Sequence, residues 1–398
     1  MKILFCSHVP LRRTLGASKL LIEVAEEMEP LGWQTSFITP TELLGQDWGN
    51  TSNRDQFAKI FSQALRGYLK ENASTYDVID YDQTHLPYSR KEFPASTLMV
   101  ARSVLLVQHF KPEIVKIINQ PKSNWKSRSK FLVKNILPFI KSENSLWQER
   151  MQESFSTFSQ ADLINVANSH DKAELIACGI PESKIHIFPY AINRARRLLF
   201  DQVDSKPPAK PKVAFVGTFD YRKGAKDFPR IFESILQHNS EVSFKLIGTK
   251  GLYSSKEEIF SFFPRKVRGQ IEIIDSFAPD NLPHILSDCS LGLFPSYVEG
   301  FGIGVLEMLS SSVPVIAYDA PGPPMMLPGE YLVAPGDCEA MAQKILALLN
   351  DPQKLANARI WAKQQSQQFC WQKVAESTSK IYLENWQKLQ KNIPRAIG

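Results

Sequence analysis

Short apolar runs alternate with segments of helical periodicity along the whole chain. The runs are apolar almost without interruption, which is typical of parallel strands covered by helices on both faces. Strands are expected in the first half at Lys2–Ser7, Gln34–Thr39, Asp77–Asp80, Thr97–Ala101, Asp162–Ala167 and Ile185–Phe188. In the second half they are expected at Lys212–Val216, Val242–Ile247, Ile271–Ile274, Ser290–Phe294 and Val313–Tyr318. The alternation predicts an α/β protein with two doubly wound, Rossmann-like domains.

Residues 200–212 separate the two halves. Their sequence, FDQVDSKPPAKPK, combines three prolines with several charges and predicts an extended linker. We therefore expect an N-terminal domain at 1–200, a linker at 201–212 and a C-terminal domain at 213–370. Residues 371–398 are expected to hold a terminal helix with one core-facing side.

The composition restricts the class of protein. The chain has 398 residues and a formal net charge of +6, which does not by itself imply a nucleic-acid partner. Its five cysteines are scattered, which argues against a disulfide scaffold and a cysteine zinc site and suits a reducing cytoplasm. No apolar run reaches the ~18 residues of a membrane span, and the apolar start of MKILFCSHVP is too short for a signal peptide.

The stretch 290–319 carries the strongest candidate chemistry. It is expected to form a strand, a loop with Glu299, Gly300, Phe301 and Gly302, and a helix that begins near Ile303. Ligands of open α/β sheets bind at the carboxyl ends of strands, and helix N-termini favour phosphate. Glu307, on the same helix, can accept hydrogen bonds from a vicinal diol such as a ribose.

The stretch EGFGIGVLEM, with seven residues between Glu299 and Glu307, resembles the signature of retaining GT-B glycosyltransferases, glycosyltransferase family 4 in particular. The resemblance implies that Glu299 lies by the donor sugar and that the backbone of residues 300–302 contacts its hydroxyls. It also implies that Glu307 binds the nucleotide ribose. The alternative is an ordinary strand–helix turn with two solvated carboxylates.

A second stretch, VAFVGTFDYRKGAKDF at 213–228, agrees with this family. There, a Gly-Arg pair and a following Lys-Gly bind the donor diphosphate. Gly217 and Lys223 match that pattern, whereas Thr218 stands where the family has arginine. Arg222 is a candidate replacement for the missing charge, or a solvated neighbour of Lys223.

The first half matches the family less specifically. Gly16 stands in the turn where the family has a glycine-rich loop by the donor phosphates. Arg102 and His109 are candidates for the acceptor side, although a single histidine is more often structural. Asp80-Tyr81-Asp82 would be a metal site only in the other glycosyltransferase fold, GT-A.

Residues 111–150 hold a basic segment with interleaved apolar side chains, which could contact an anionic membrane or form a solvated helix. No nucleic-acid-binding module is visible.

The resemblance thus implies a GT-B fold, in which two Rossmann-like domains face across a cleft. The domain at 1–200 would bind the acceptor and the domain at 213–370 the nucleotide-sugar donor, and the helix of 371–398 could cross back to the N-terminal domain. The enzyme is expected in the cytoplasm, and at the inner membrane face if 111–150 binds lipid. The resemblance implies transfer of a hexose-type sugar from a nucleotide diphosphate sugar to a glycan, a lipid-linked sugar or a small molecule, for instance in polysaccharide biosynthesis. It also implies that the anomeric configuration is retained and that neither a metal nor another cofactor is needed. Rivals are a sugar-nucleotide epimerase or phosphorylase on the same fold and a non-catalytic nucleotide-sugar-binding protein.

Overall fold

The computed structural model describes residues 1–13, 16–46, 54–84, 88–110, 137–203, 208, 210–253 and 255–392, without the side chains of 16–17, 54–55 and 137–147. The chain forms two compact units. Unit 1 comprises Met1–Ala167, Asp171–Phe188 and Gln372–Gly398, and unit 2 comprises Asn168–His170 and Pro189–Trp371.

Unit 1 contains a parallel six-stranded sheet in the order β2-β1-β3-β4-β5-β6. Its strands are β1 (Lys2–Cys6), β2 (Gln34–Ile38), β3 (Val78–Asp82), β4 (Leu98–Arg102), β5 (Leu163–Val166) and β6 (Ile185–Ile187). The helices are α1 (Gly16–Met28), α2 (Pro40–Leu44), α3 (Arg54–Asn72), α6 (Leu137–Gln160), α7 (Ser169–Ala177) and, at the end of the chain, α15 (Trp371–Asn392). All six strands predicted for this half are confirmed within one or two residues.

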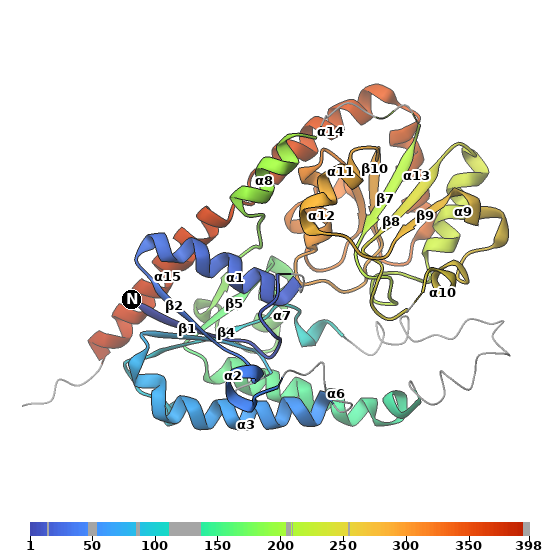
Figure 1. The fold of residues 1–398 in the computed structure, drawn as a ribbon. Coiled ribbons are helices and arrows are strands. Elements are labelled where there is room, and N and C mark those ends of the chain that lie inside the picture. Colours follow the sequence, from blue (N-terminus) through green and yellow to red (C-terminus); the bar gives the residue numbers. More distant parts are fainter. Residues whose placement is uncertain are drawn as a thin grey trace, which may run out of the picture. The chain divides into compact units, whose positions relative to one another are not determined.

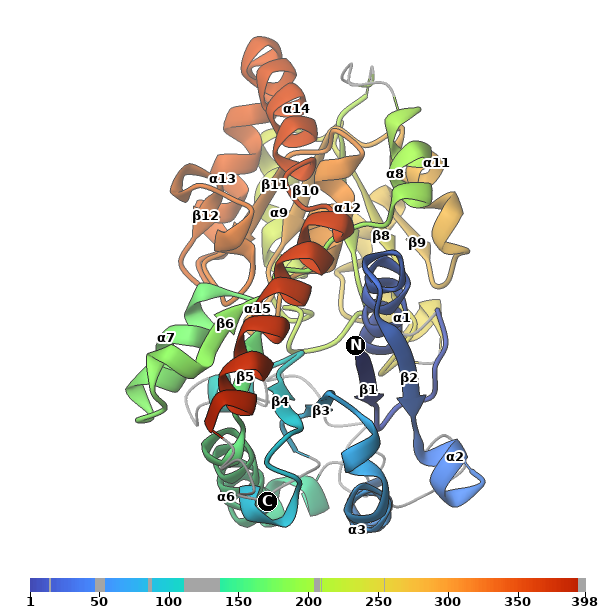
Figure 2. The ribbon, with the colours of Figure 1, turned by 90° about the vertical axis from the view of Figure 1, so that its left-hand side faces the viewer.

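Alternate residues of the unit 1 strands enter two separate cores. Leu4, Ile79 and Met99 pack on the face covered by α3 and α6, and Ile3, Val78 and Leu98 on the face covered by α1 and α15. Both faces are buried because parallel strands need helices on each side. Figure 2 shows α15 lying along the unit 1 sheet, where the Tyr382 hydroxyl donates to Asp80 Oδ2 at 2.7 Å.

Unit 2 contains a second parallel sheet, in the order β12-β11-β10-β7-β8-β9. Its strands are β7 (Lys212–Val216), β8 (Ser243–Ile247), β9 (Ile271–Ile274), β10 (Leu291–Phe294), β11 (Val315–Tyr318) and β12 (Leu332–Val333). Its helices are α8 (Arg194–Asp201), α9 (Phe228–His238), α10 (Lys256–Phe260), α11 (Leu282–Leu286), α12 (Ile303–Ser310), α13 (Cys338–Leu349) and α14 (Pro352–Ser366). The five predicted strands are confirmed; β12, with only two residues, is additional.

The order in which strands are added to the unit 2 sheet reverses between β7 and β10, although these two strands are parallel. The chain builds outward from β7 through β8 to β9, and then from β10, on the other side of β7, to β12. Helices α9 and α13 cover one face, and α12 and α14 the other (Figure 1). Ligands in such sheets bind beyond the carboxyl ends of the strands at the point of reversal. The loops after β7 and β10 are therefore the place to look for a site.

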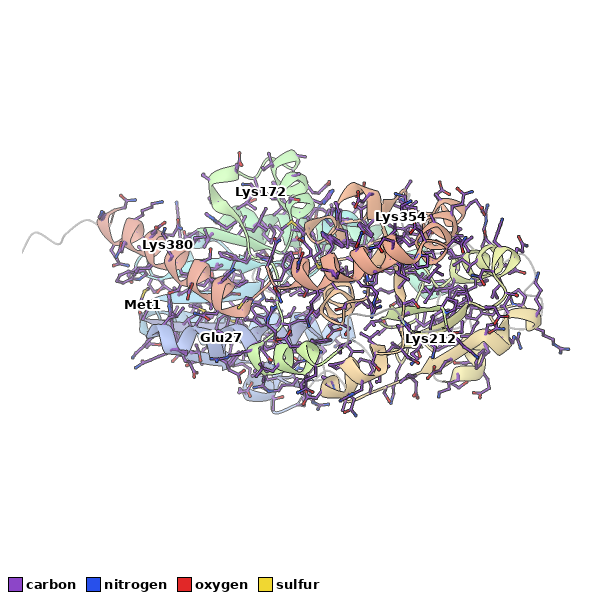
Figure 3. The ribbon with its side chains drawn as sticks, turned by 90° about the horizontal axis from the view of Figure 1, so that it is seen from above. Met1, Glu27, Lys172, Lys212, Lys354 and Lys380 are labelled. Carbon is purple, nitrogen blue, oxygen red and sulfur yellow. The ribbon has the colours of Figure 1, made fainter. Side chains whose placement is uncertain are left out.

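Lysines lie on the exposed sides of the helices of both units. Lys354 on α14 and Lys380 on α15, labelled in Figure 3, are both exposed. In the part of the chain that the structure describes, none of the helices has the length and apolarity needed to cross a lipid bilayer.

Candidate active site in unit 2

Helix α12, which follows the loop after β10, approaches the end of β7 closely because it has a glycine at the point of contact. The helix begins after Gly302, whose φ of +84° lies in the left-handed region that glycine adopts without strain. A Cβ on Gly304 would lie only 2.4 Å from the Val216 carbonyl oxygen at the end of β7. Glycine at this position therefore lets the first turn of α12 approach the point where the sheet reverses.

The loop after β7 packs against the loop after β10. The backbone N–H of Tyr297 donates to the Arg222 carbonyl at 2.9 Å. Gly224 has a φ of +81°, and a Cβ there would lie 2.3 Å from the Pro295 carbonyl oxygen. The close backbone contact brings the side chains of both loops into one cluster.

Glu299 lies at the centre of this cluster. Its side chain is 7% exposed and forms an ion pair with the Lys223 ammonium, which is itself 13% exposed. Arg222 Nη1 lies 3.3 Å from Glu299 Oε1 and donates to the Val298 carbonyl at 2.9 Å. The structure thus brings together the three residues predicted from two separate motifs, at the carboxyl ends of β7 and β10.

The charges of this cluster shift its protonation equilibria. Burial alone would raise the pKa of the Glu299 carboxyl, but the nearby Lys223 and Arg222 outweigh burial and hold the pKa below its ordinary value of 4.5. Burial lowers the pKa of the Lys223 ammonium, an effect that Glu299 opposes. The carboxylate is therefore the favoured form of Glu299 at neutral pH.

The lowered pKa of Glu299 predicts a loss of stability in acid. A carboxyl whose pKa is lowered on folding contributes stability above its unfolded pKa, and this is lost as the pH falls through the folded pKa. In urea denaturation below about pH 4.5, the unfolding free energy of the wild type should fall more steeply than that of Glu299→Gln. Exposed Glu330→Gln serves as the control, and parallel curves for wild type and Glu299→Gln would contradict the assignment.

Glu307 lies on α12 and is 8% exposed. Its Oε1 is 2.8 Å from Nη2 of Arg196, which is 5% exposed and lies on α8. The sequence predicts two carboxylates that face a ligand. In the structure each carboxylate is largely buried and paired with a cation, because a buried carboxylate needs a partner for its charge.

Thr218 interacts with Asp220 rather than with Glu299. The Thr218 hydroxyl donates to Asp220 Oδ2 at 2.8 Å, and the Lys223 N–H donates to Asp220 Oδ1 at 3.0 Å. Gly217, just before Thr218, donates its N–H to the Ile247 carbonyl at 2.9 Å. Asp220 thus orders the loop from which Lys223 extends, a role that the sequence did not reveal.

Gly300 and Phe301 have partners distant in sequence. The buried Asn168 amide donates to the Gly300 carbonyl, and the Phe301 ring packs edge-on to Tyr190 and Phe369, each with centroids 5.5 Å apart. Neither Asn168 nor Arg196 was a candidate from the sequence. Each residue follows a predicted strand, but nothing else in the sequence near it indicates a role. Contacts between residues more than 100 positions apart leave no local sequence pattern.

The candidates in unit 1 are engaged within that unit. Arg102 is buried, pairs with Asp80 and donates to the Cys6 carbonyl at 3.1 Å. His109 Nε2 lies 2.6 Å from Asp171 Oδ1, and Gly16 is the first residue of α1. In the Asp80-Tyr81-Asp82 stretch, Asp82 Oδ1 accepts from the Thr84 N–H at 3.1 Å. The basic segment 111–150 lies largely outside the described residues.

Unit 2, which holds the site, matches a known protein family. Residues 210–351 match the family described as "Glycosyl transferases group 1". This match assigns residues 210–351, which hold Lys223, Glu299 and Glu307, to the group 1 glycosyltransferases. The predicted enzyme class, a glycosyltransferase, is confirmed, and membership of family 4 is compatible with this match.

Similar proteins extend the comparison over both units. The O-antigen chain mannosyltransferase B of Escherichia coli is 24% identical over 280 residues, which cover 67% of this chain and 68% of that protein. Two further curated relatives are aligned over only 34% and 47% of their own lengths.

Two solved structures have a similar fold over both units. The sucrose-phosphate synthase from Thermosynechococcus elongatus has a TM-score of 0.71 and 16% identity, covering 96% of this chain and 98% of that one. HepE from Anabaena in complex with UDP and glucose has a TM-score of 0.65 and 16% identity, covering 96% of this chain and 100% of that one. The predicted GT-B fold is confirmed.

Proposed function

We propose that this glycosyltransferase moves a hexose-type sugar from a nucleotide diphosphate sugar to an acceptor hydroxyl with retention of configuration. The observation that carries the proposal is the cluster of Lys223, Arg222 and Glu299 at the carboxyl ends of β7 and β10, with Glu307 on the helix that follows. The similar fold of HepE, a protein solved with UDP and glucose, supports a donor of this class. The O-antigen chain mannosyltransferase supports a glycan acceptor.

The chemistry assigns a role to each charge. As the bond between the anomeric carbon and the diphosphate oxygen breaks, its electron pair leaves with the diphosphate, and Lys223 and Arg222 stabilise the added negative charge. Glu299 favours the positive charge that develops on the sugar ring. The acceptor oxygen bonds to the anomeric carbon on the same face, and its proton passes to the departing phosphate oxygen.

We propose that the reaction needs no metal and that unit 1 binds the acceptor. Asp80, the first residue of the Asp-x-Asp pair, already pairs with Arg102 and accepts from Tyr382. Its carboxylate is thus used in holding α15 on the unit 1 sheet. We also propose that the enzyme is cytoplasmic and that residues 111–150 contact an anionic membrane surface.

A thermal-shift screen of UDP-, GDP-, ADP- and CDP-sugars tests the donor class. A donor at about 100 times its Kd should add about 2.7 kcal/mol to the free energy of unfolding. Incubation with glycan acceptors should then release the nucleoside diphosphate, with the anomeric configuration retained by NMR, and excess EDTA should leave the rate unchanged.

Several outcomes would contradict the proposal. Binding without turnover over the acceptor panel favours a non-catalytic protein, and epimerised donor without release of nucleoside diphosphate favours an epimerase. A requirement for inorganic phosphate favours a phosphorylase. A loss of rate in EDTA that Mn²⁺ restores would contradict the metal-free reaction.

A further inference from the structure

Arg196, which comes before the region matched by the family, forms a buried ion pair with Glu307. The Arg196 side chain is 6% exposed and the Glu307 side chain 11% exposed, and the Arg196 Nη2 to Glu307 Oε1 distance is 2.8 Å. Such a pair is costly to desolvate and is not by itself evidence of stabilisation. Glu307, however, lies on α12 only eight residues after Glu299, so the pair with Arg196 can affect the site.

Two further contacts hold Arg196 in place. Asn193 caps α8 by accepting the Arg196 N–H at 2.8 Å, and the guanidinium lies 5.5 Å from the centroid of the Phe200 ring. At the other end of the helices, the Lys363 ammonium donates to the Phe200 carbonyl at 2.7 Å and to the Ser310 carbonyl at 2.9 Å. Helix α8 is thus fixed to α12 near both of its ends.

The guanidinium also has a donor that the surrounding protein does not satisfy. Arg196 Nε is buried and has no hydrogen-bond partner among the described residues. An unsatisfied buried donor costs roughly 1–3 kcal/mol, so such a group calls for an explanation. A ribose hydroxyl beside Glu307 would supply the missing acceptor, because a hydroxyl both donates to a carboxylate and accepts from a guanidinium.

We propose that Arg196 is a specificity-determining residue for the nucleotide ribose. It orients the carboxylate of Glu307, which accepts from the ribose hydroxyls, and its Nε–H donates to a hydroxyl oxygen. An arginine suits this role because its planar fork presents several donors in fixed directions and remains charged. The inference rests on the proposed function, and it adds a residue from α8 to the donor site.

The experiment compares nucleotides with and without ribose hydroxyls. Calorimetry first measures Kd for UDP, GDP, ADP and CDP, and then for the 2′-deoxy and 2′,3′-dideoxy forms of the tightest binder. The wild type should prefer the ribose form by about tenfold or more, as expected when a site has groups that hydrogen-bond a hydroxyl. In Arg196→Gln the ribose and deoxy forms should bind with nearly equal Kd. Arg196→Lys should keep only part of the wild-type preference for ribose.

Arg197→Gln is the matched control. Arg197 lies on the same helix, but its Nη2 donates to the Phe369 carbonyl at 2.6 Å rather than to Glu307. This variant should lose stability and keep the full ribose preference. If Arg196→Gln and Arg196→Lys are folded by circular dichroism and also keep it, Arg196 is only structural and the inference is wrong. If the wild type binds none of the four diphosphates, the proposed function itself fails.

Discussion

Replacing Lys223 by alanine is expected to lower turnover by about 10²–10³, the usual cost of removing a group that stabilises developing charge in a transition state. Lys223 is the more buried of the two cations that contact Glu299, with a side chain 13% exposed against 26% for Arg222. Its Nζ lies 5.0 Å from the centroid of the Phe294 ring at the end of β10, and the proposed function places the leaving diphosphate beside it. Steady-state kinetics with the donor found in the screen measure the effect.

The control for this variant comes from the same loop. Lys226 Nζ lies 4.8 Å from the centroid of the Tyr221 ring, and Lys226→Ala should retain nearly full turnover. The melting temperature of each variant separates lost chemistry from lost folding. A fully active Lys223→Ala enzyme would contradict the diphosphate role of Lys223.

Replacing Glu307 by alanine is expected to weaken nucleoside diphosphate binding about 100-fold, because hydrogen bonds to a charged group contribute about 1.5–3 kcal/mol. The same change leaves the buried Arg196 guanidinium without its carboxylate, and breaking a buried pair costs about 3–5 kcal/mol of stability. Calorimetry measures the affinity, and urea denaturation measures the unfolding free energy.

A second variant keeps the Glu307 prediction testable if the alanine variant unfolds. Glu307→Gln preserves the volume and one acceptor oxygen for Arg196, so it should fold and still bind the nucleotide at least tenfold more weakly than wild type. Exposed Glu330→Gln controls for the loss of one negative charge. Unchanged affinity in a folded Glu307→Gln would remove the ribose role.

The fold followed from the sequence because its strands are buried on both faces. The ranges Lys212–Val216 and Ile271–Ile274 are the observed β7 and β9 to the residue, since continuous apolar runs between helical segments have few other interpretations. The predicted helix start at Ile303 is also confirmed. The two-residue β12 was missed because it is too short to show a pattern.

The composition of the site was only partly predictable. Glu299, Lys223 and Glu307 lie in motifs whose loops follow strands, so their approach to one another follows from the topology. Arg196 and Asn168 could not be found in this way. Their contacts with Glu307 and Gly300 span 111 and 132 residues and depend on how α8 and the segment after β5 fold back within unit 2.

The backbone contacts between the loops after β7 and β10 restrict how this enzyme can be re-engineered. Arg222 and Tyr297 share a main-chain hydrogen bond, and Gly224 has no room for a side chain beside Pro295. A graft that imports only one loop from another transferase would face an unmatched neighbour and misplace Lys223. Chimaeras intended to alter donor choice should exchange 217–227 and 295–302 together, as a single cassette.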